Sequence, residues 1–429
     1  MRIRIEKGRV LDPASGRDEI CTVLVEDGII RTVSPECREE ADQVIDAAGC
    51  WVMPGLIDLH VHFRDPGFTY KETIATGSRA AARGGFTAVC PMANTDPVID
   101  SPEMVSFLLE KARRESVVRI LPIGAVTKGL AGEELTDMAA MKAAGAVAFS
   151  EDGKTVMNAA LYRRGLEQAA ALDLVVMDHC EDRNLLQESA MRAGTVAEAR
   201  RVSGVSHSAE DVITARDILL ARETGAKLHL CHCSTAASAW MAAQAKAAGV
   251  KLTAEVCPHH FTLTYEDIPE GDANFKMAPP LRERKDVEAL RQALKTGAMD
   301  VISTDHAPHS EEEKARPFPE APNGIVGLET AVALAVTELV ETGILTPLEL
   351  AEKMSHRPAQ ILGLSLGTLG EGSPADVTIV DPAAEYVIDK NQFASKGRNT
   401  PFHGRRVRGK VRYTLVAGKI VYAAEEENL

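Results

Sequence analysis

Short apolar runs rich in β-branched residues alternate with helical patterns of about 10 to 15 residues through most of the chain. This alternation is typical of βα units that build a parallel sheet. Eight runs predict strands: Gly55–Phe63, Phe86–Cys90, Val117–Val126, Ala146–Ser150, Leu172–His179, Ala226–Cys233, Val250–Cys257 and Asp300–Asp305. The patterns between them predict helices, among them Glu72–Arg83, Glu133–Ala144, Met157–Ala171, Ala209–Thr224, Ala236–Ala248 and Val287–Thr296.

Eight strands with intervening helices predict an α/β fold of the (β/α)8 kind, a TIM barrel. A doubly wound open sheet is the alternative. It is disfavoured because no glycine-rich phosphate loop follows the first strand.

Both ends of the chain have a different pattern, with short strands, turns and no helical period. The N-terminal end predicts strands at Ile3–Val10, Thr22–Val25 and Ile29–Val33, and the C-terminal end predicts them at Ala375–Val380, Val411–Val416 and Ile420–Val421. Neither set is large enough to stand alone. We therefore expect a small composite β-sandwich domain built from residues 1–53 and 366–429, around a barrel of residues 54–365.

Charge and composition exclude several classes of protein. Lys and Arg number 48 against 62 Asp and Glu, a net charge of −14 without a basic block, so nucleic acid and anionic membranes are poor partners. The N-terminus has no apolar leader, and no apolar stretch of about 18 residues occurs, so we expect a cytoplasmic protein. Eight cysteines without disulfide spacing are expected to be reduced and structural.

The first barrel strand runs into two histidines and an arginine, in the stretch Leu56 to Gly67. Side chains alternate between the two faces of a strand, so His60 and His62 point to the same face and can hold one ion. Arg64 is expected on that face too. Pro66 and Gly67 then end the strand. An isolated pair of this kind could equally be a buried, hydrogen-bonded polar pair.

Further metal-ligand residue types stand at the ends of other predicted strands. They are Asp152 after strand four, His179 at the end of strand five, His232 in strand six, and Asp305 at the end of strand eight. The C-terminal strand ends of a barrel converge on one mouth. Several imidazoles and carboxylates crowded there would be costly unless cations bind.

Two segments carry a family resemblance: Pro54 to Gly67, and Thr304 to His309. Together with Pro91 to Thr95, Ser150 to Gly153, Pro279 to Arg282 and Gly324 to Thr330, they resemble the dihydroorotase family of the amidohydrolase superfamily, nearly end to end. The Asp in Ser150 to Gly153 resembles the longer bacterial class. Other relatives bridge their metals with a carboxylated lysine, for which Lys154 is a lesser candidate here.

The resemblance implies two zinc ions per chain. One would be held by His60, His62 and Asp305, the other by His179 and His232, with Asp152 bridging them. Two zincs lower the pKa of a shared water and polarise a carbonyl. Asp305 would accept the water's proton and return it to the departing ring nitrogen. The reaction that the resemblance implies is the reversible interconversion of dihydroorotate and N-carbamoyl-L-aspartate in pyrimidine biosynthesis.

The resemblance also implies a site for the substrate carboxylate. Its members would be His62, Arg64, Asn94 and His309, with backbone groups of Asn323 and Gly324 reading the ring amide. Arg64 could instead form a salt bridge with Asp65 or Glu72.

Two positions depart from the family pattern. Ala278 stands where relatives commonly have an asparagine that contacts substrate, and position 323 is often aromatic.

Three other segments are interpreted from pattern alone. The adjacent His259 and His260 are expected to face opposite ways, so that at most one points inward. The polar stretch from Ser310 to Pro322 predicts a loop, either a ligand-ordered lid or an inert surface loop. The thiols flanking His232 are expected on the opposite face from its imidazole.

Two rival functions remain open. Another cyclic amidohydrolase, such as a hydantoinase or allantoinase, would not need Arg64, because a hydantoin has no carboxylate. A non-catalytic scaffold of aspartate transcarbamoylase would have lost metal ligands, and none is lost here. For partners we expect a small-molecule substrate, a homo-oligomer with a dimer as first choice, and aspartate transcarbamoylase as a candidate.

Overall fold

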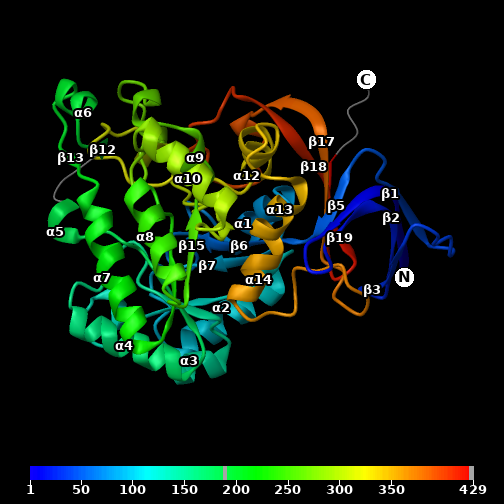
Figure 1. The fold of residues 1–429 in the computed structure, drawn as a ribbon, viewed down its shortest axis with the longest axis horizontal. Coiled ribbons are helices and arrows are strands. Elements are labelled where there is room, and N and C mark those ends of the chain that lie inside the picture. The colour runs from blue at the N-terminus through cyan, green and yellow to red at the C-terminus, as the bar shows by residue number, and fades with distance from the viewer. Residues whose placement is uncertain (187–190, 425–429) are drawn as a thin grey trace.

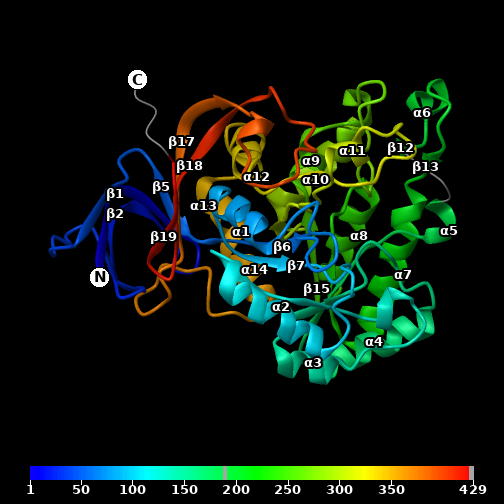
Figure 2. The ribbon, with the colours of Figure 1, turned by 180° about the vertical axis from the view of Figure 1, so that it is seen from behind.

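The computed structural model describes residues 1–186 and 191–424. An α/β part with parallel strands makes up most of the molecule, and a β sheet built from both ends of the chain lies at one side of it (Figure 1). Helices α7 and α8 lie on the side away from that sheet, as both views show (Figure 2).

The α/β part contains two parallel sheets. One has the order β6-β7-β8 and the other β9-β10-β11-β14-β15-β16. The strands are β6 (Leu56–Val61), β7 (Phe86–Pro91), β8 (Arg119–Ile120), β9 (Ile123–Ala125), β10 (Ala148–Ser150), β11 (Val175–Asp178), β14 (Lys227–Leu230), β15 (Leu252–Val256) and β16 (Val301–Ile302).

The two sheets are connected at both ends. β8 and β9 are parts of one strand interrupted at Pro122, and a parallel bridge joins Val61, at the end of β6, to His306, just beyond β16. The His62 N–H donates to the His306 carbonyl at 2.8 Å. The strand pairings therefore run in a circuit, which is a TIM-barrel-type arrangement.

Helices follow most of these strands. They are α1 (Ile74–Arg83), α2 (Pro102–Glu115), α3 (Met138–Ala144), α4 (Ala159–Ala171), α5 (Arg183–Leu186), α6 (Thr195–Ala199), α7 (Ser208–Thr224), α8 (Ala236–Ala247), α9 (Pro258–Thr262), α10 (Arg284–Thr296), α11 (Glu311–Lys314), α12 (Ala331–Ala335), α13 (Pro347–Ala351) and α14 (Arg357–Ile361). Single turns occur at η1 (Lys128–Leu130), η2 (Tyr265–Asp267), η3 (Ala273–Phe275) and η6 (Lys390–Gln392). π-helical segments η4 (Val336–Val340) and η5 (Glu352–His356) continue α12 and α13, and η5 leads into α14.

Local sequence explains where the barrel helices begin and end. Thr73 and Thr235 cap α1 and α8 by accepting hydrogen bonds from backbone N–H groups of the first turn. α7 and α10 end at Gly225 and Gly297, which take left-handed φ angles of 69° and 80°. All six residues of β6 are buried, as expected for a parallel strand covered on both faces.

The second part is one eight-stranded sheet with the order β19-β18-β17-β5-β1-β2-β3, and β4 pairs with β1. Its strands are β1 (Arg2–Asp12), β2 (Arg17–Glu26), β3 (Ile29–Ser34), β4 (Gln43–Asp46), β5 (Trp51–Pro54), β17 (Val377–Val387), β18 (Arg406–Val416) and β19 (Lys419–Ala423). β5 joins the two halves, because it pairs with β1 on one side and with β17 on the other. One sheet is therefore assembled from both ends of the chain.

Three features differ from the sequence-based expectations. β6 ends at Val61, before His62 and Arg64. The stretch from Ser310 to Pro322 contains the short helix α11, which Ser310 caps. A small parallel pair, β12 (Met191–Arg192) with β13 (Gly204–Val205), had no predicted counterpart.

Within the two described ranges, no helix is both long and apolar enough to cross a membrane.

Candidate metal centre

Six side chains from five strand ends meet at the C-terminal mouth of the parallel strands. His60 lies on β6, and the others lie one to three residues beyond the end of β6, β10, β11, β14 or β16. All six are buried: His60, His62, Asp152, His179, His232 and Asp305. The sequence-predicted convergence of these residues therefore exists in space.

Asp152 lies at the centre of this group. Its Oδ1 is 3.2 Å from His60 Nε2, 3.6 Å from His179 Nδ1 and 3.7 Å from His232 Nε2, and its Oδ2 is 3.4 Å from His62 Nε2. One carboxylate thus faces four imidazoles. This is the position that a ligand shared by two ions would occupy.

Asp305 lies on the β6 side of the group. Its Oδ1 is 3.1 Å from His62 Nε2 and 3.6 Å from His60 Nε2. On the other side, His179 Nδ1 and His232 Nε2 are 2.8 Å apart. Two sets of donor atoms are close enough to hold a metal ion, namely His60 with His62 and Asp305, and His60 with Asp152 and His232.

Outer residues fix the direction of three of the imidazoles. His60 Nδ1 lies 2.8 Å from Glu255 Oε1, and His179 Nε2 lies 3.0 Å from Glu181 Oε2. Because a carboxylate only accepts, each neutral ring carries its proton on that nitrogen and has its lone pair on the other, which faces Asp152 in His60 and both His232 and Asp152 in His179. Asn94 Oδ1 accepts from His62 Nδ1 at 2.9 Å in the same way.

Sequence reasoning missed Glu255 and Glu181. Glu255 is a single acid within the otherwise apolar end of β15, and it also accepts hydrogen bonds from the His232 N–H and from His229. A lone carboxylate in a buried strand was the available signal, because such a group must be paired.

Burial and charge shift the pKa values in opposite directions here. Burial raises the pKa of Asp152, but the imidazoles of His60, His179 and His232 outweigh it and hold that pKa well below its usual range. Asp305 behaves likewise, and its pKa falls to about 2. Burial lowers the pKa of His60, yet Asp152, Asp305 and Glu255 raise it well above normal. The centre therefore favours charged carboxylates and a positive charge between the rings.

Arg64 and His309 lie beside this group. Arg64 Nε donates to the Pro308 carbonyl at 3.3 Å, and Arg64 Nη2 is 3.4 Å from His309 Nε2. The salt-bridge alternative is wrong, because Asp65 pairs with Lys111 and Glu72 with His306.

The backbone at Asn323 and Gly324 already has partners. His309 Nε2 donates to the Asn323 carbonyl at 2.8 Å, and the Gly324 N–H donates to the Lys276 carbonyl at 3.0 Å. Lys154 points elsewhere, since its Nζ donates to the Leu130 carbonyl at 3.0 Å.

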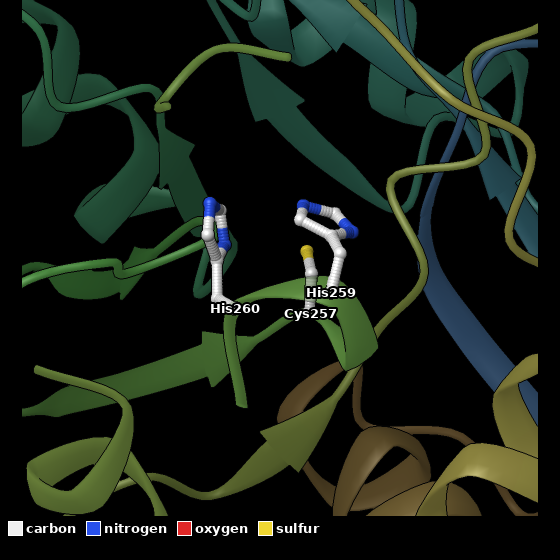
Figure 3. Close-up of side chains that lie close together, drawn as sticks. All are labelled: Cys257, His259 and His260. Atoms are coloured by element: carbon white, nitrogen blue, oxygen red, sulfur yellow. The ribbon is translucent and has the colours of Figure 1, made fainter. Parts of the chain in front are cut away.

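Two arguments from strand alternation are wrong beyond the strand ends. Arg64 has a left-handed φ of 58°, so the turn and not strand parity directs it. His259 and His260 belong to helix α9 and not to a strand, and their ring centroids are 4.2 Å apart. Both lie on the same side of the backbone (Figure 3).

Buried lysines attach the segment from Ser310 to Pro322 to the rest of the chain. Lys276 Nζ donates to the carbonyls of Pro319 and Ala321 at 2.7 and 2.6 Å, and Lys314 Nζ donates to that of Lys276 at 3.2 Å. The segment is thus held by several hydrogen bonds in this structure.

The chain is similar to known proteins over nearly its whole length. A family profile described as "Dihydro-orotase-like" matches residues 49–238. A dihydroorotase of Pelotomaculum thermopropionicum is 51% identical over 421 residues, which cover 98% of both chains. A dihydroorotase of Caldanaerobacter subterraneus subsp. tengcongensis is 48% identical over 98% of this chain and 97% of its own.

Among solved structures, the L-hydantoinase (dihydropyrimidinase) of Arthrobacter aurescens shares the fold. Its TM-score is 0.88 at 27% identity, and the match covers 99% of this chain and 96% of that one. The full-length identity to the curated relatives settles the family. The chain belongs to the dihydroorotase family of cyclic amidohydrolases.

Proposed function

We propose that the protein is a metal-dependent dihydroorotase, which interconverts N-carbamoyl-L-aspartate and L-dihydroorotate plus water in pyrimidine biosynthesis. The observation that carries the proposal is the carboxylate of Asp152 among four imidazoles, with Asp305 and the Arg64 guanidinium beside it. Relatives about half identical over nearly the whole chain are named dihydroorotase.

We propose two zinc ions, with His60, His62 and Asp305 as ligands of one, His179 and His232 as ligands of the other, and Asp152 between them. The donors fit, because His60 Nε2 and Asp152 Oδ1 are buried without a hydrogen-bond partner. Imidazole and carboxylate ligands suit zinc. When bound, such a pair supplies a water of lowered pKa and polarises the scissile carbonyl.

Asp305 is proposed as the catalytic acid and base. Its Oδ1 faces His62, and its other oxygen would accept the proton released as the ring amide is attacked. Asp305 would then donate that proton to the departing ring nitrogen. In the direction of ring closure the same carboxyl takes the proton from the carbamoyl nitrogen.

The substrate carboxylate is proposed to bind Arg64 and His309, with Asn94 and His62 next to them. None of the ion pairs found in the described ranges involves Arg64, so its guanidinium has no acid of its own there. A guanidinium of this kind suits an anionic substrate in a chain of net charge −14.

Asn323 and Gly324 are proposed to read the ring amide through their backbone. They adjoin His309, whose Nε2 donates to the Asn323 carbonyl. Their use by substrate requires an exchange of the hydrogen bonds that they make to His309 and Lys276.

We also propose how the chain is organised into domains. Residues 54–365 form a closed eight-stranded barrel, and residues 1–53 and 366–429 form a β sandwich. Support for the sandwich comes from one apolar cluster that joins residues of β1 and β2 to residues of β17 and β18. We further propose a cytoplasmic homodimer, with aspartate transcarbamoylase as a candidate partner.

A substrate comparison tests the function. The purified chain with zinc is given dihydroorotate, hydantoin or allantoin, and ring opening is followed by absorbance. We expect turnover of dihydroorotate only. Turnover of hydantoin without dihydroorotate would make the protein a hydantoinase, and turnover of none would favour a scaffold.

A further inference from the structure

Three donor side chains gather where β15 turns into α9, outside the group around Asp152. Cys257 directly precedes the helix, and His259 and His260 lie in its first turn. One ligand atom of each lies within 4.8 Å of those of the other two. The three are 0%, 1% and 3% exposed, and Figure 3 shows the sulfur between the two rings.

One nitrogen atom in each of these two rings is buried without a hydrogen-bond partner. His260 Nε2 donates to the Pro279 carbonyl at 3.0 Å, so in the neutral ring the lone pair lies on Nδ1, which has no hydrogen-bond partner. His259 Nε2 has no partner either. Buried imidazole nitrogens without partners are uncommon, and two of them beside a thiol call for a ligand.

We propose that Cys257, His259 and His260 form a third cation site, which takes a borderline-soft divalent ion such as Zn²⁺. One thiolate and two imidazoles are a zinc ligand set that leaves a fourth position for water. Burial and the nearby Asp305 and Glu255 carboxylates raise the pKa of the Cys257 thiol well above its usual value, and a coordinated divalent ion would deprotonate that thiol. The proposal does not depend on the proposed activity.

A second buried thiol also lies among possible ligands, in the group of His60, Cys231 and Glu255. There the two other donors are already paired with each other, at 2.8 Å between His60 Nδ1 and Glu255 Oε1. No such pairing is found among Cys257, His259 and His260. Cys257 is therefore the better thiolate ligand.

Cobalt titration of the metal-free full-length protein tests the site. A thiolate bound to Co²⁺ gives a near-ultraviolet charge-transfer band, which the imidazole and carboxylate ligands around Asp152 cannot give. We expect that band in the wild type and its loss in Cys257→Ser. Zinc bound per chain, measured by elemental analysis, should fall by one ion in Cys257→Ser and in His260→Asn.

Cys50 is a buried thiol directly before β5, and Cys50→Ser is the matched control, which should keep both the band and the zinc content. Circular dichroism establishes that each variant is folded. The proposal is overturned if the wild type shows no thiolate band, if Cys257→Ser retains it, or if Cys231→Ser loses it while Cys257→Ser does not.

Discussion

Glu255 is the residue through which the metal centre can be perturbed without touching a proposed ligand. Its Oε1 lies 2.8 Å from His60 Nδ1 and 3.1 Å from the His232 N–H, and its Oε2 lies 3.1 Å from His229 Nε2. It thereby orients ligands of both proposed ions. Glu255→Gln keeps the shape and removes the charge.

The size of the effect follows from these contacts. The carbonyl of the Gln side chain can still accept a hydrogen bond from His60. Its amide can donate to His229 Nε2 if the His229 proton moves to Nδ1, which then donates to Thr253 Oγ1, 2.8 Å away. The hydrogen bonds survive, whereas the negative charge that makes His60 more basic is lost. Loss of such an orienting partner typically weakens metal binding by about 10- to 100-fold, or about 1.4 to 2.7 kcal/mol.

The assay is zinc affinity by competition with a chelator, measured together with turnover of dihydroorotate. Thr253→Val is the matched control: it removes the hydroxyl from His229 but leaves Glu255 and His60 in contact, so zinc affinity should stay as in the wild type. If folded Glu255→Gln binds zinc as tightly as the wild type, the orienting role assigned to Glu255 is wrong.

Four further predictions address substrate, catalysis, stability and the segment beside the site. Arg64→Met should lower kcat/KM for dihydroorotate roughly 10- to 150-fold, mainly through KM, because about 1.5 to 3 kcal/mol of charged hydrogen bonding is lost; an unchanged KM would remove Arg64 from the carboxylate site. Asp305→Ala should keep its circular dichroism spectrum and lose about 10²- to 10⁴-fold in kcat, and retained activity would contradict its role as acid and base. Burial raises the pKa of Glu329 from 4.5 to about 7, so its contribution to stability is full below pH 4.5 and is lost as the pH rises to about 7. Glu329→Gln should therefore flatten the fall of Tm across that window, and equal slopes in both proteins would refute the shift. Cleavage by a glutamyl endopeptidase after the exposed Glu311 should slow when dihydroorotate is added, whereas equal rates would show that the segment is not a lid.

The TIM-barrel-type fold was predictable from sequence because its strands are short apolar runs and several of the intervening helices carry their own caps. Thr73 and Thr235, for example, both cap helices that the pattern had predicted. Strand three was less predictable. Its mostly apolar run extends from Val117 to Val126, but the strand is interrupted at Pro122 and forms the separate strands β8 and β9.

The positions of the six candidate ligands were predictable because barrel topology brings strand ends together. The residues that orient them were not. Glu255 is 195 positions away from His60 in sequence, and no local pattern joins them. Glu181, two residues after His179, could have been found by its spacing.

The prediction for His259 and His260 failed because strand alternation was assumed to continue beyond Val256, where the strand ends. Pro258 stands in the first turn of α9, where its fixed φ suits a helix start. The chain therefore leaves the strand at Val256, and both imidazoles lie on one side. Recognising Pro258 as a helix start would have changed the prediction.

The same limit applies at the centre of the site. Arg64, His232 and Asp305 have left-handed φ angles of 58°, 34° and 48°, which non-glycine residues rarely adopt. Each lies two or three residues beyond the end of its strand, so its own backbone conformation directs its side chain and the surrounding packing must hold the strained backbone. Glycine would relieve that strain but would remove the guanidinium, imidazole or carboxylate. Alternation therefore predicts a barrel side chain only as far as the last residue of the strand, and beyond it the chemistry at the mouth depends on turns whose conformation tertiary packing decides.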